Sequence, residues 1–338
     1  MAASHLSGPL IVGGLNLSAM ISEAVRPNVR GRAGGRVFYV GASSLALVAE
    51  MRLAGQPVYP TLFGTTGALA GLGGRTTSGD VIYVLPGHTE SVSAADMASD
   101  TGAASGFSVV GLGTETMRPA FTWTAAAATW LLDTENVEIA NCRLFWAGAT
   151  TSTTALTVAA PITVSAAGCR LVNNYIQTGV DADQIVTVGC TTTAAGDDFV
   201  FDGNFVEGDP AAEITAAGTV LRLVGADRAR VTNNYMAAAL ATDTDGLIEF
   251  LTTASTNVLV RNNFIYANGS GNTCAIDAGA AIANTGYIDW NQLVVDADGT
   301  AQTVAFTVSG TCNFALGQNN YMVSNNNERG LIVGTATT

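Results

Sequence analysis

The 338-residue chain contains no lysine, so arginine supplies all 14 of its basic residues, and it has only two histidines. Charged residues make up 12% of the chain, and the formal net charge is −13. An acidic protein does not suit general nucleic-acid binding, which needs a basic surface. No apolar run reaches the ~18 residues that would span a bilayer. We therefore expect neither nucleic acid nor a membrane among the partners of this protein.

Metal, redox and catalytic motifs are also missing. No two cysteines form a C-x-x-C pair, which argues against zinc and redox sites and favours buried free thiols. The cysteines are Cys142, Cys169, Cys190, Cys274 and Cys312. No phosphate loop or Ser-His-Asp arrangement is present. His88, two residues before Glu90, fits a turn or cap role better than a catalytic one. We expect no catalytic residue, no metal and no cofactor.

What the chain does contain is a repeat built on paired asparagines, as in "LVNNYIQ" (171–177) and "VRNNFIYANG" (260–269). The repeated asparagine falls at Asn174, Asn204, Asn234, Asn263, Asn291 and Asn320, with spacings of 30, 30, 29, 28 and 29 residues. A fixed period of this length is typical of stacked structural units.

Apolar residues alternate with polar ones around each asparagine, which predicts strands and not helices. Two residues after the asparagine, for example, stand Ile176, Val206 and Met236. Each unit also contains a second apolar run, such as "TVLRLVG" (219–225). Each unit thus contains short strands and one recurring turn pattern. This organisation predicts an all-β solenoid, whose coils of about 28–30 residues stack by parallel strand pairing.

The asparagines fit such a coil in two ways. At a tight corner, asparagine tolerates unusual backbone angles, and its amide can bond nearby backbone groups. Stacked in register, each asparagine can also bond the one above and the one below, so we expect a structural asparagine ladder.

Aromatic residues form a second column, immediately after the ladder asparagines. They are Tyr175, Phe205, Tyr235, Phe264 and Tyr321, with Gln292 as the exception. If they point outward, they form a long apolar stripe of the kind that monomers rarely expose. We therefore treat them as a candidate oligomer interface, covered either by the N-terminal segment or by other chains. If the corner inverts the alternation, these rings belong to the core.

Charge is distributed unevenly along the chain. Residues 1–36 carry Arg26, Arg30, Arg32 and Arg36 against one acid, Glu23, and are either a solvated leader or an attachment arm that docks on an acidic surface. Acidic residues gather in the loops between strands. They are Asp181, Asp183, Glu207, Asp209, Asp243, Asp245, Asp296 and Asp298. A solvated turn edge, a glycosidase carboxylate pair and a loose calcium site are the three interpretations.

The ladder and coils resemble those of right-handed parallel β-helix proteins of the pectate-lyase type. The segments "SGDVIYVLPGHTESV" (78–92) and "GFSVVGLGTETMRPAFTW" (106–123) are similar to the first coils of bacteriophage structural proteins with this fold, and "NERGLIVGTATT" (327–338) is similar to their ends. The resemblance implies a right-handed helix. We divide the chain into a basic arm (1–36), an adapter with the opening coil (37–105), the parallel β-helix (106–330) and a C-terminal tail (331–338).

The resemblance also implies a function. We expect a bacteriophage virion structural protein, a capsid decoration or cement protein that attaches to the shell and stabilises it. A tailspike-like receptor-binding protein or polysaccharide depolymerase is the alternative. The expected partners are the major capsid protein or other virion subunits, and the expected assembly is a homotrimer. The start of the chain lacks a basic n-region, so we expect no secretory signal, synthesis in the host cytoplasm and a location on the capsid surface.

Overall fold

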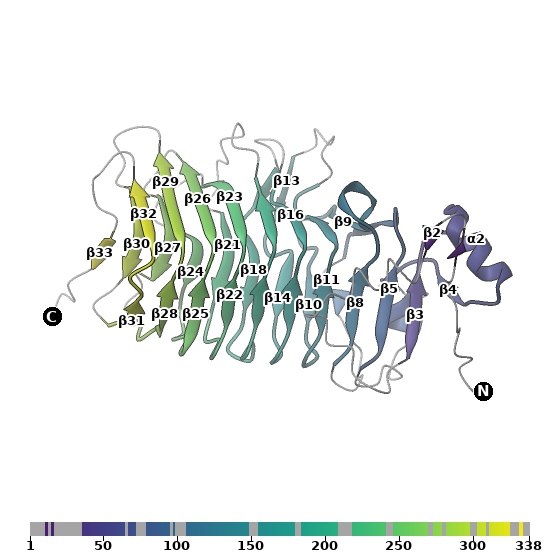
Figure 1. Ribbon diagram of the computed structural model, residues 1–338, viewed down its shortest axis with the longest axis horizontal. Helices are drawn as coiled ribbons and strands as arrows, with labels where there is room; N and C mark the ends of the chain where they lie inside the picture. The colour runs from purple at the N-terminus through teal and green to yellow at the C-terminus, as the bar shows by residue number, and fades with distance from the viewer. Residues whose placement is uncertain are drawn as a thin grey trace.

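Apolar residues at every second position form short strands, and these strands build three long parallel sheets in the computed structural model (Figure 1). Each coil supplies one strand to the first sheet, one to the second and one to the third, and then stacks on the previous coil. The structure describes residues 11–12, 15–16, 36–64, 67–71, 79–94, 97–98, 106–148, 155–179, 184–208, 218–240, 246–269, 273–278, 282–297, 303–308, 311–324 and 331–333. The prediction of a parallel β-helix is confirmed.

The sheets are continuous over most of the chain. The first sheet contains 11 strands, in the order β4 (Val58–Tyr59), β3 (Val37–Val40), β5 (Val81–Val84), β8 (Ser108–Gly111), β11 (Glu138–Ala140), β15 (Arg170–Val172), β19 (Val200–Asp202), β22 (Arg230–Thr232), β25 (Val258–Arg261), β28 (Thr285–Asp289) and β31 (Asn313–Leu316). The second contains nine, namely β6 (Thr89–Val92), β9 (Ala120–Trp123), β12 (Arg143–Phe145), β16 (Tyr175–Gln177), β20 (Phe205–Glu207), β23 (Tyr235–Leu240), β26 (Phe264–Gly269), β29 (Gln292–Ala297) and β32 (Tyr321–Ser324). The third also contains nine, namely β7 (Met97–Ala98), β10 (Trp130–Leu132), β14 (Ile162–Val164), β18 (Val188–Thr192), β21 (Thr219–Leu223), β24 (Gly246–Phe250), β27 (Thr273–Ala278), β30 (Thr303–Val308) and β33 (Leu331–Val333).

A few elements lie outside these sheets. They are the antiparallel pair β1 (Ile11–Val12) and β2 (Leu15–Asn16), the parallel pair β13 (Leu156–Val158) and β17 (Gln184–Val186), the helices α2 (Ala46–Leu53) and α3 (Ala68–Gly71), and the 3₁₀ turn η1 (Glu115–Met117). Among the described residues, no helix has the length and apolar character needed to cross a membrane.

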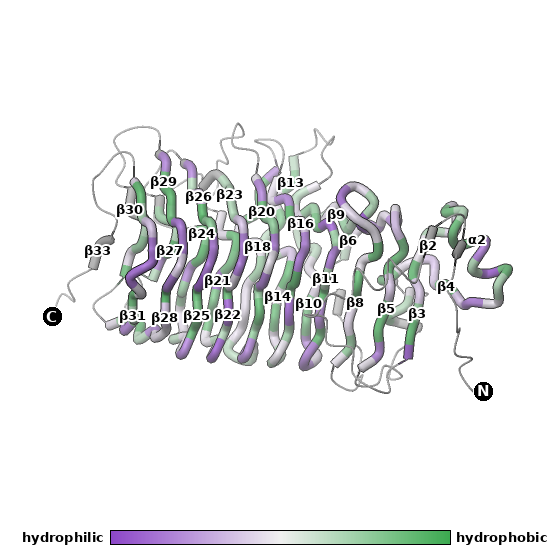
Figure 2. The backbone as a smooth tube through the Cα atoms, viewed as in Figure 1, coloured by the Kyte–Doolittle hydropathy of each residue, from purple (hydrophilic) through white to green (hydrophobic). Residues whose placement is uncertain are grey.

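The core fills the space enclosed by the three sheets. The apolar columns expected from the sequence point into it, and residues such as Leu171, Phe201 and Val206 are fully buried. Figure 2 shows hydrophobic and hydrophilic segments recurring from coil to coil. Four of the cysteines are buried free thiols, and burial raises the pKa of the Cys142 and Cys169 thiols to about 12. These thiols therefore stay protonated and pack as small apolar side chains.

The N-terminal end of the solenoid is covered by residues before β5. Helix α2 packs outside the first sheet, where Val48 and Met51 meet Tyr83 and Val110. Phe63 packs edge-to-face on Phe121 and Trp130 at the end of the core. Because β5 pairs with β8, the stacking runs without a break from the opening coil into the body of the helix.

Candidate functional site

From β11 to β29, six consecutive coils turn from the first sheet to the second through two residues, and these two residues have different tasks. The first adopts left-handed backbone angles with φ between 54° and 65°, which asparagine and glycine tolerate best. The residues at this position are Asn141, Asn173, Gly203, Asn233, Asn262 and Trp290. We call this turn the asparagine corner.

The second residue of each pair points into the core and forms the predicted ladder. The side-chain oxygen of Asn234, for example, accepts hydrogen bonds from the backbone N–H and the side-chain nitrogen of Asn204, at 2.8 and 3.2 Å. The Asn234 side-chain nitrogen donates to the Phe201 carbonyl and to Asn263 Oδ1, both at 2.9 Å. The same pattern runs from Asn174 to Asn320, so the buried amides satisfy one another along the stack.

The column that follows the ladder points outward, and its rings stack on one another. Tyr175, Phe205, Tyr235 and Phe264 lie on neighbouring strands of the second sheet in register. Their ring centroids are 5.9, 4.6 and 5.0 Å apart, with interplanar angles of 7°, 6° and 8°. Phe205 and Tyr235 are 41% and 39% exposed. These rings are therefore not core residues, and the face they form is the aromatic column.

The two ends of the aromatic column differ. At the Tyr175 end, the Arg143 guanidinium lies over the rings of Phe145 and Tyr175, 4.8 and 5.7 Å from their centroids. At the other end, exposed Gln292 interrupts the column, and Tyr321 resumes it on the next strand, 62% exposed. At one end of the column the Arg143 guanidinium covers the last rings, whereas at the other end Tyr321 is exposed to solvent.

Two of the loop acids lie beside this column, and each accepts a hydrogen bond from a tyrosine. The Tyr175 hydroxyl donates to Glu207, and the Tyr266 hydroxyl donates to Asp296 at 3.1 Å. Desolvation and the hydrogen bond to Glu207 raise the pKa of Tyr175, so the phenol stays protonated at neutral pH. The remaining predicted loop acids lie outside the described residues. They are Asp181, Asp183, Asp209, Asp243, Asp245 and Asp298.

One pair of carboxylates does come together elsewhere. Glu249 and Asp277 are register partners on β24 and β27 of the third sheet. Glu249 is buried, accepts a 2.6 Å hydrogen bond from Arg222 Nε and lies 3.3 Å from Thr219 Oγ1. A buried carboxylate held by an ion pair is a structural arrangement, and we assign this pair to the fold. Across the described ranges, no three His, Cys, Asp or Glu side chains gather as a metal site.

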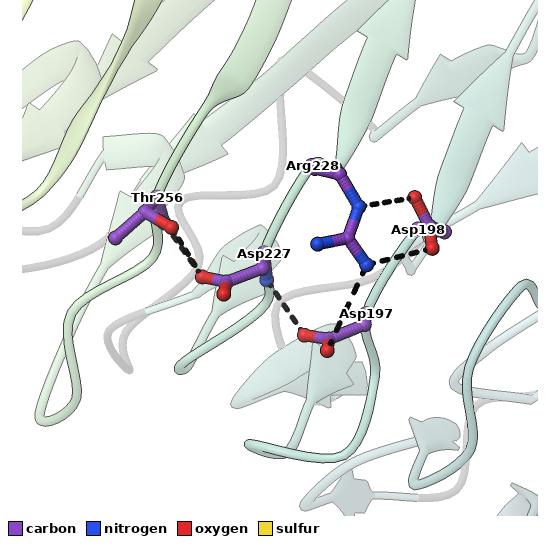
Figure 3. Close-up of polar contacts among 5 residues, drawn as sticks. All are labelled: Asp197, Asp198, Asp227, Arg228 and Thr256. Carbon is purple, nitrogen blue, oxygen red and sulfur yellow. Dashed lines mark hydrogen bonds and ion pairs between the residues drawn. The ribbon is translucent and has the colours of Figure 1, made fainter.

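The corner between the third sheet and the first carries charged side chains (Figure 3). Arg228 donates two hydrogen bonds to Asp198, at 2.8 and 2.9 Å, and one of its nitrogens lies 4.0 Å from Asp197. The Asp197 side chain accepts from the Asp227 backbone N–H, and Asp227 accepts from Thr256. The hydrogen bonds from Arg228 lower the pKa of Asp198. This corner is a solvated chain of polar contacts.

The predicted arm is only partly described, whereas His88 is described in full. Arg36 forms an ion pair with buried Asp80 at 2.7 Å, whereas Arg26, Arg30 and Arg32 lie outside the described residues. His88 takes the ladder position of the opening coil and lies 3.0 Å from Glu90. Glu90 also accepts from the backbone N–H groups of Leu62 and Phe63. The His88–Glu90 pair thus fastens the segment that covers the end of the core.

Sequence reasoning missed the role of Trp290. It is 53% exposed and occupies the left-handed position that asparagine or glycine fills in the preceding coils. Aligning the residue before each ladder asparagine would have found it, because the column then reads Asn173, Gly203, Asn233, Asn262 and Trp290. An exposed tryptophan at a strained corner, next to a stacked aromatic column, makes this side of the molecule the candidate interaction surface.

No protein family, no curated protein and no solved structure matches this chain.

Proposed function

We propose that this protein is a bacteriophage virion structural protein, a decoration or cement protein that attaches to the capsid and stabilises it, and that it acts as a homotrimer. The aromatic column is the observation that carries the proposal. Its rings stack face to face at the spacing of the strands, so only their edges point outward. A row of ring edges repeated at ~4.8 Å fits best against a surface with the same spacing, such as another copy of this helix.

The internal bonding of the solenoid supports a structural role. The asparagine ladder and the partly buried ion pairs Arg170–Glu138 and Arg222–Glu249 connect successive coils, in addition to the strand pairing. Such a rod is held together along its whole length by contacts between neighbours. We infer the virion setting from the resemblance that residues 78–92 and 106–123 bear to the first coils of phage structural proteins.

The N-terminal arm is the proposed attachment device for the shell. Because Arg36 is engaged by Asp80, we assign attachment to the other three arginines of the arm, Arg26, Arg30 and Arg32. Deleting residues 1–35 keeps the Arg36–Asp80 pair, and we expect the truncated chain to fold but not to bind the shell. Full binding by the truncated chain would remove the arm from the mechanism. Exposed charge attraction is screened within ~8–10 Å, so neutral replacements of the three arginines should weaken binding most at low salt.

Quantitative mass spectrometry of purified virions tests the proposal. A decoration protein is present in a fixed, high ratio to the major shell protein, whereas a tail protein is present in only a few copies per particle. The protein is also assayed on neutral and acidic polysaccharides with and without calcium, and we expect no new reducing ends or unsaturated products. A low copy number together with polysaccharide cleavage would replace this proposal with the tailspike-like alternative.

A further inference from the structure

Trp290 is retained at a position that disfavours it. A bulky side chain with φ of 56° is strained, and neighbouring coils place Asn233 and Asn262 there without strain. Those asparagines also bond to each other, since Asn262 Nδ2 donates to Asn233 Oδ1 at 2.7 Å and Asn233 Nδ2 donates to Asp202 Oδ1 at 2.7 Å. Tryptophan ends this outer chain of hydrogen bonds. Its side chain is 53% exposed, so burial within its own chain does not offset the strain.

The aromatic column is interrupted on the same coil, only two residues later. Gln292 is exposed and stands between Phe264 and Tyr321, its register partners on the two neighbouring strands. At a strand spacing of ~4.8 Å, positions two strands apart are separated by about 9.6 Å. An aromatic ring in contact with a ring on each side needs about 7–8 Å. One flat ring therefore fits in the interruption once the Gln292 side chain moves aside.

We propose that Trp290 of one copy inserts at Gln292 of a neighbouring copy, between Phe264 and Tyr321. The inference rests on the homotrimer of the proposed function and specifies the contact that holds it together. Copies related by rotation about an axis parallel to the solenoid lie at the same height. Trp290 and Gln292 belong to one coil, so a rotation brings them level without any axial shift. Each copy then inserts its indole into one neighbour and accepts the indole of the other neighbour, so identical contacts close the ring.

The surroundings of Trp290 suit such a contact. Tyr287 and Tyr321 are 42% and 62% exposed, and tyrosine and tryptophan dominate the energetics of protein interfaces. Asp289 holds the corner in shape, because it accepts hydrogen bonds from the Tyr287 hydroxyl at 3.2 Å and from Asn319 Nδ2 at 3.4 Å. The backbone that carries the indole is thus fixed before association, which lowers the entropic cost of binding.

Two substitutions separate assembly from folding. Trp290→Asn restores the residue that relieves the corner, and Gln292→Phe continues the aromatic column. Each should leave the stability of the dissociated subunit unchanged or higher. Each should also raise the concentration at which the trimer dissociates at least about thirtyfold, the loss that corresponds to removing an interface hot spot. If these residues served only the fold of their own chain, both variants would remain trimers.

A variant in which the tryptophan is moved by one coil serves as the control. In Asn262→Trp/Trp290→Asn, the tryptophan lies one coil earlier, level with Phe264, where the column has no interruption. We expect this variant to dissociate like Trp290→Asn, although its composition equals that of the wild-type chain. Leu53→Ser removes an exposed apolar side chain from α2, 89% exposed, and should remain a trimer.

Analytical ultracentrifugation of the wild-type chain and these variants measures their oligomeric state and tests the inference. A wild-type trimer that Trp290→Asn and Gln292→Phe dissociate supports the inference. A trimer that persists in either variant, or that the displaced tryptophan restores, overturns the inference but leaves the homotrimer standing. A monomeric wild-type chain overturns both. Acrylamide quenching gives a second readout, because Trp123, Trp130 and Trp146 are fully buried, so quenching reports mainly Trp290, which association should protect.

Discussion

Two columns run side by side along this solenoid, one residue apart in the sequence, and they differ in what their side chains touch. The asparagine ladder, with Asn234 at its centre, is buried, and its amide groups bond along the stack. The aromatic column, with Tyr235 at its centre, is partly exposed, and its rings contact each other and solvent. The same 28–30-residue repeat therefore builds an internal support and an external surface.

The difference shows how repetition acts on each side of the chain. Inside, a repeated polar group is favourable because every copy satisfies its neighbours and none is left without a partner. Outside, a repeated apolar group lengthens an exposed stripe with each coil, which favours association. The two columns should therefore respond oppositely to substitution, the inner one through stability and the outer one through assembly.

The largest effect on stability is expected in the ladder. Asn234→Leu and Asn263→Leu should each lower the free energy of unfolding by roughly 1–3 kcal/mol, because each leaves buried amide and backbone groups unpaired. The double variant should lose less than the sum, since the two residues share the hydrogen bond from Asn234 Nδ2 to Asn263 Oδ1. Urea unfolding of the two single variants and the double variant measures this coupling, and strict additivity would count against the ladder.

Substitution in the aromatic column should affect stability less. Tyr235→Ser removes two stacking contacts at a partly exposed site, and we expect a loss of about 0.5–1 kcal/mol from the free energy of unfolding of the subunit. Its effect on self-association should be larger than its effect on folding. Urea unfolding and light scattering of the same samples compare the two effects. A loss of stability equal to that of Asn234→Leu would show that the outer column supports the fold as much as the ladder does.

The smallest effect is expected at the charged corner. Hydrogen bonds from Arg228 lower the pKa of Asp198 in the folded state below its ordinary value. The pair therefore stabilises the protein at neutral pH, and this contribution is lost as the pH falls below about 4 and through the lowered pKa. Because both side chains are more than half exposed, solvent weakens the pair. Asp198→Asn should lower the unfolding midpoint slightly at pH 7 and leave it unchanged near pH 2; an equal change at both pH values would contradict the ion pair.

The sequence predicted the internal half of this molecule better than the external half. Strand alternation and the spacing of Asn174 to Asn320 were sufficient for the fold and the ladder, because burial and hydrogen bonding act on every coil alike. The orientation of Tyr175 and Phe205 stayed open, because it depends on how the asparagine corner rotates the chain. The cap at the N-terminal end depends on hydrogen bonds to Glu90 from the backbone N–H groups of Leu62 and Phe63, which lie 28 and 27 residues earlier in the chain. These contacts belong to no repeat, so no periodic pattern marks them. Trp290 was missed because it departs from the pattern that the repeat makes visible.

The mass of the protein in solution shows whether the aromatic column joins copies of the chain. If the aromatic column is an assembly surface, light scattering at micromolar concentration should give about three times the subunit mass of 34.5 kDa. The trimer should dissociate in the Trp290→Asn variant while the helix stays folded. A stable monomer of 34.5 kDa under the same conditions would show that the aromatic column is a surface stack within one chain and not an assembly surface.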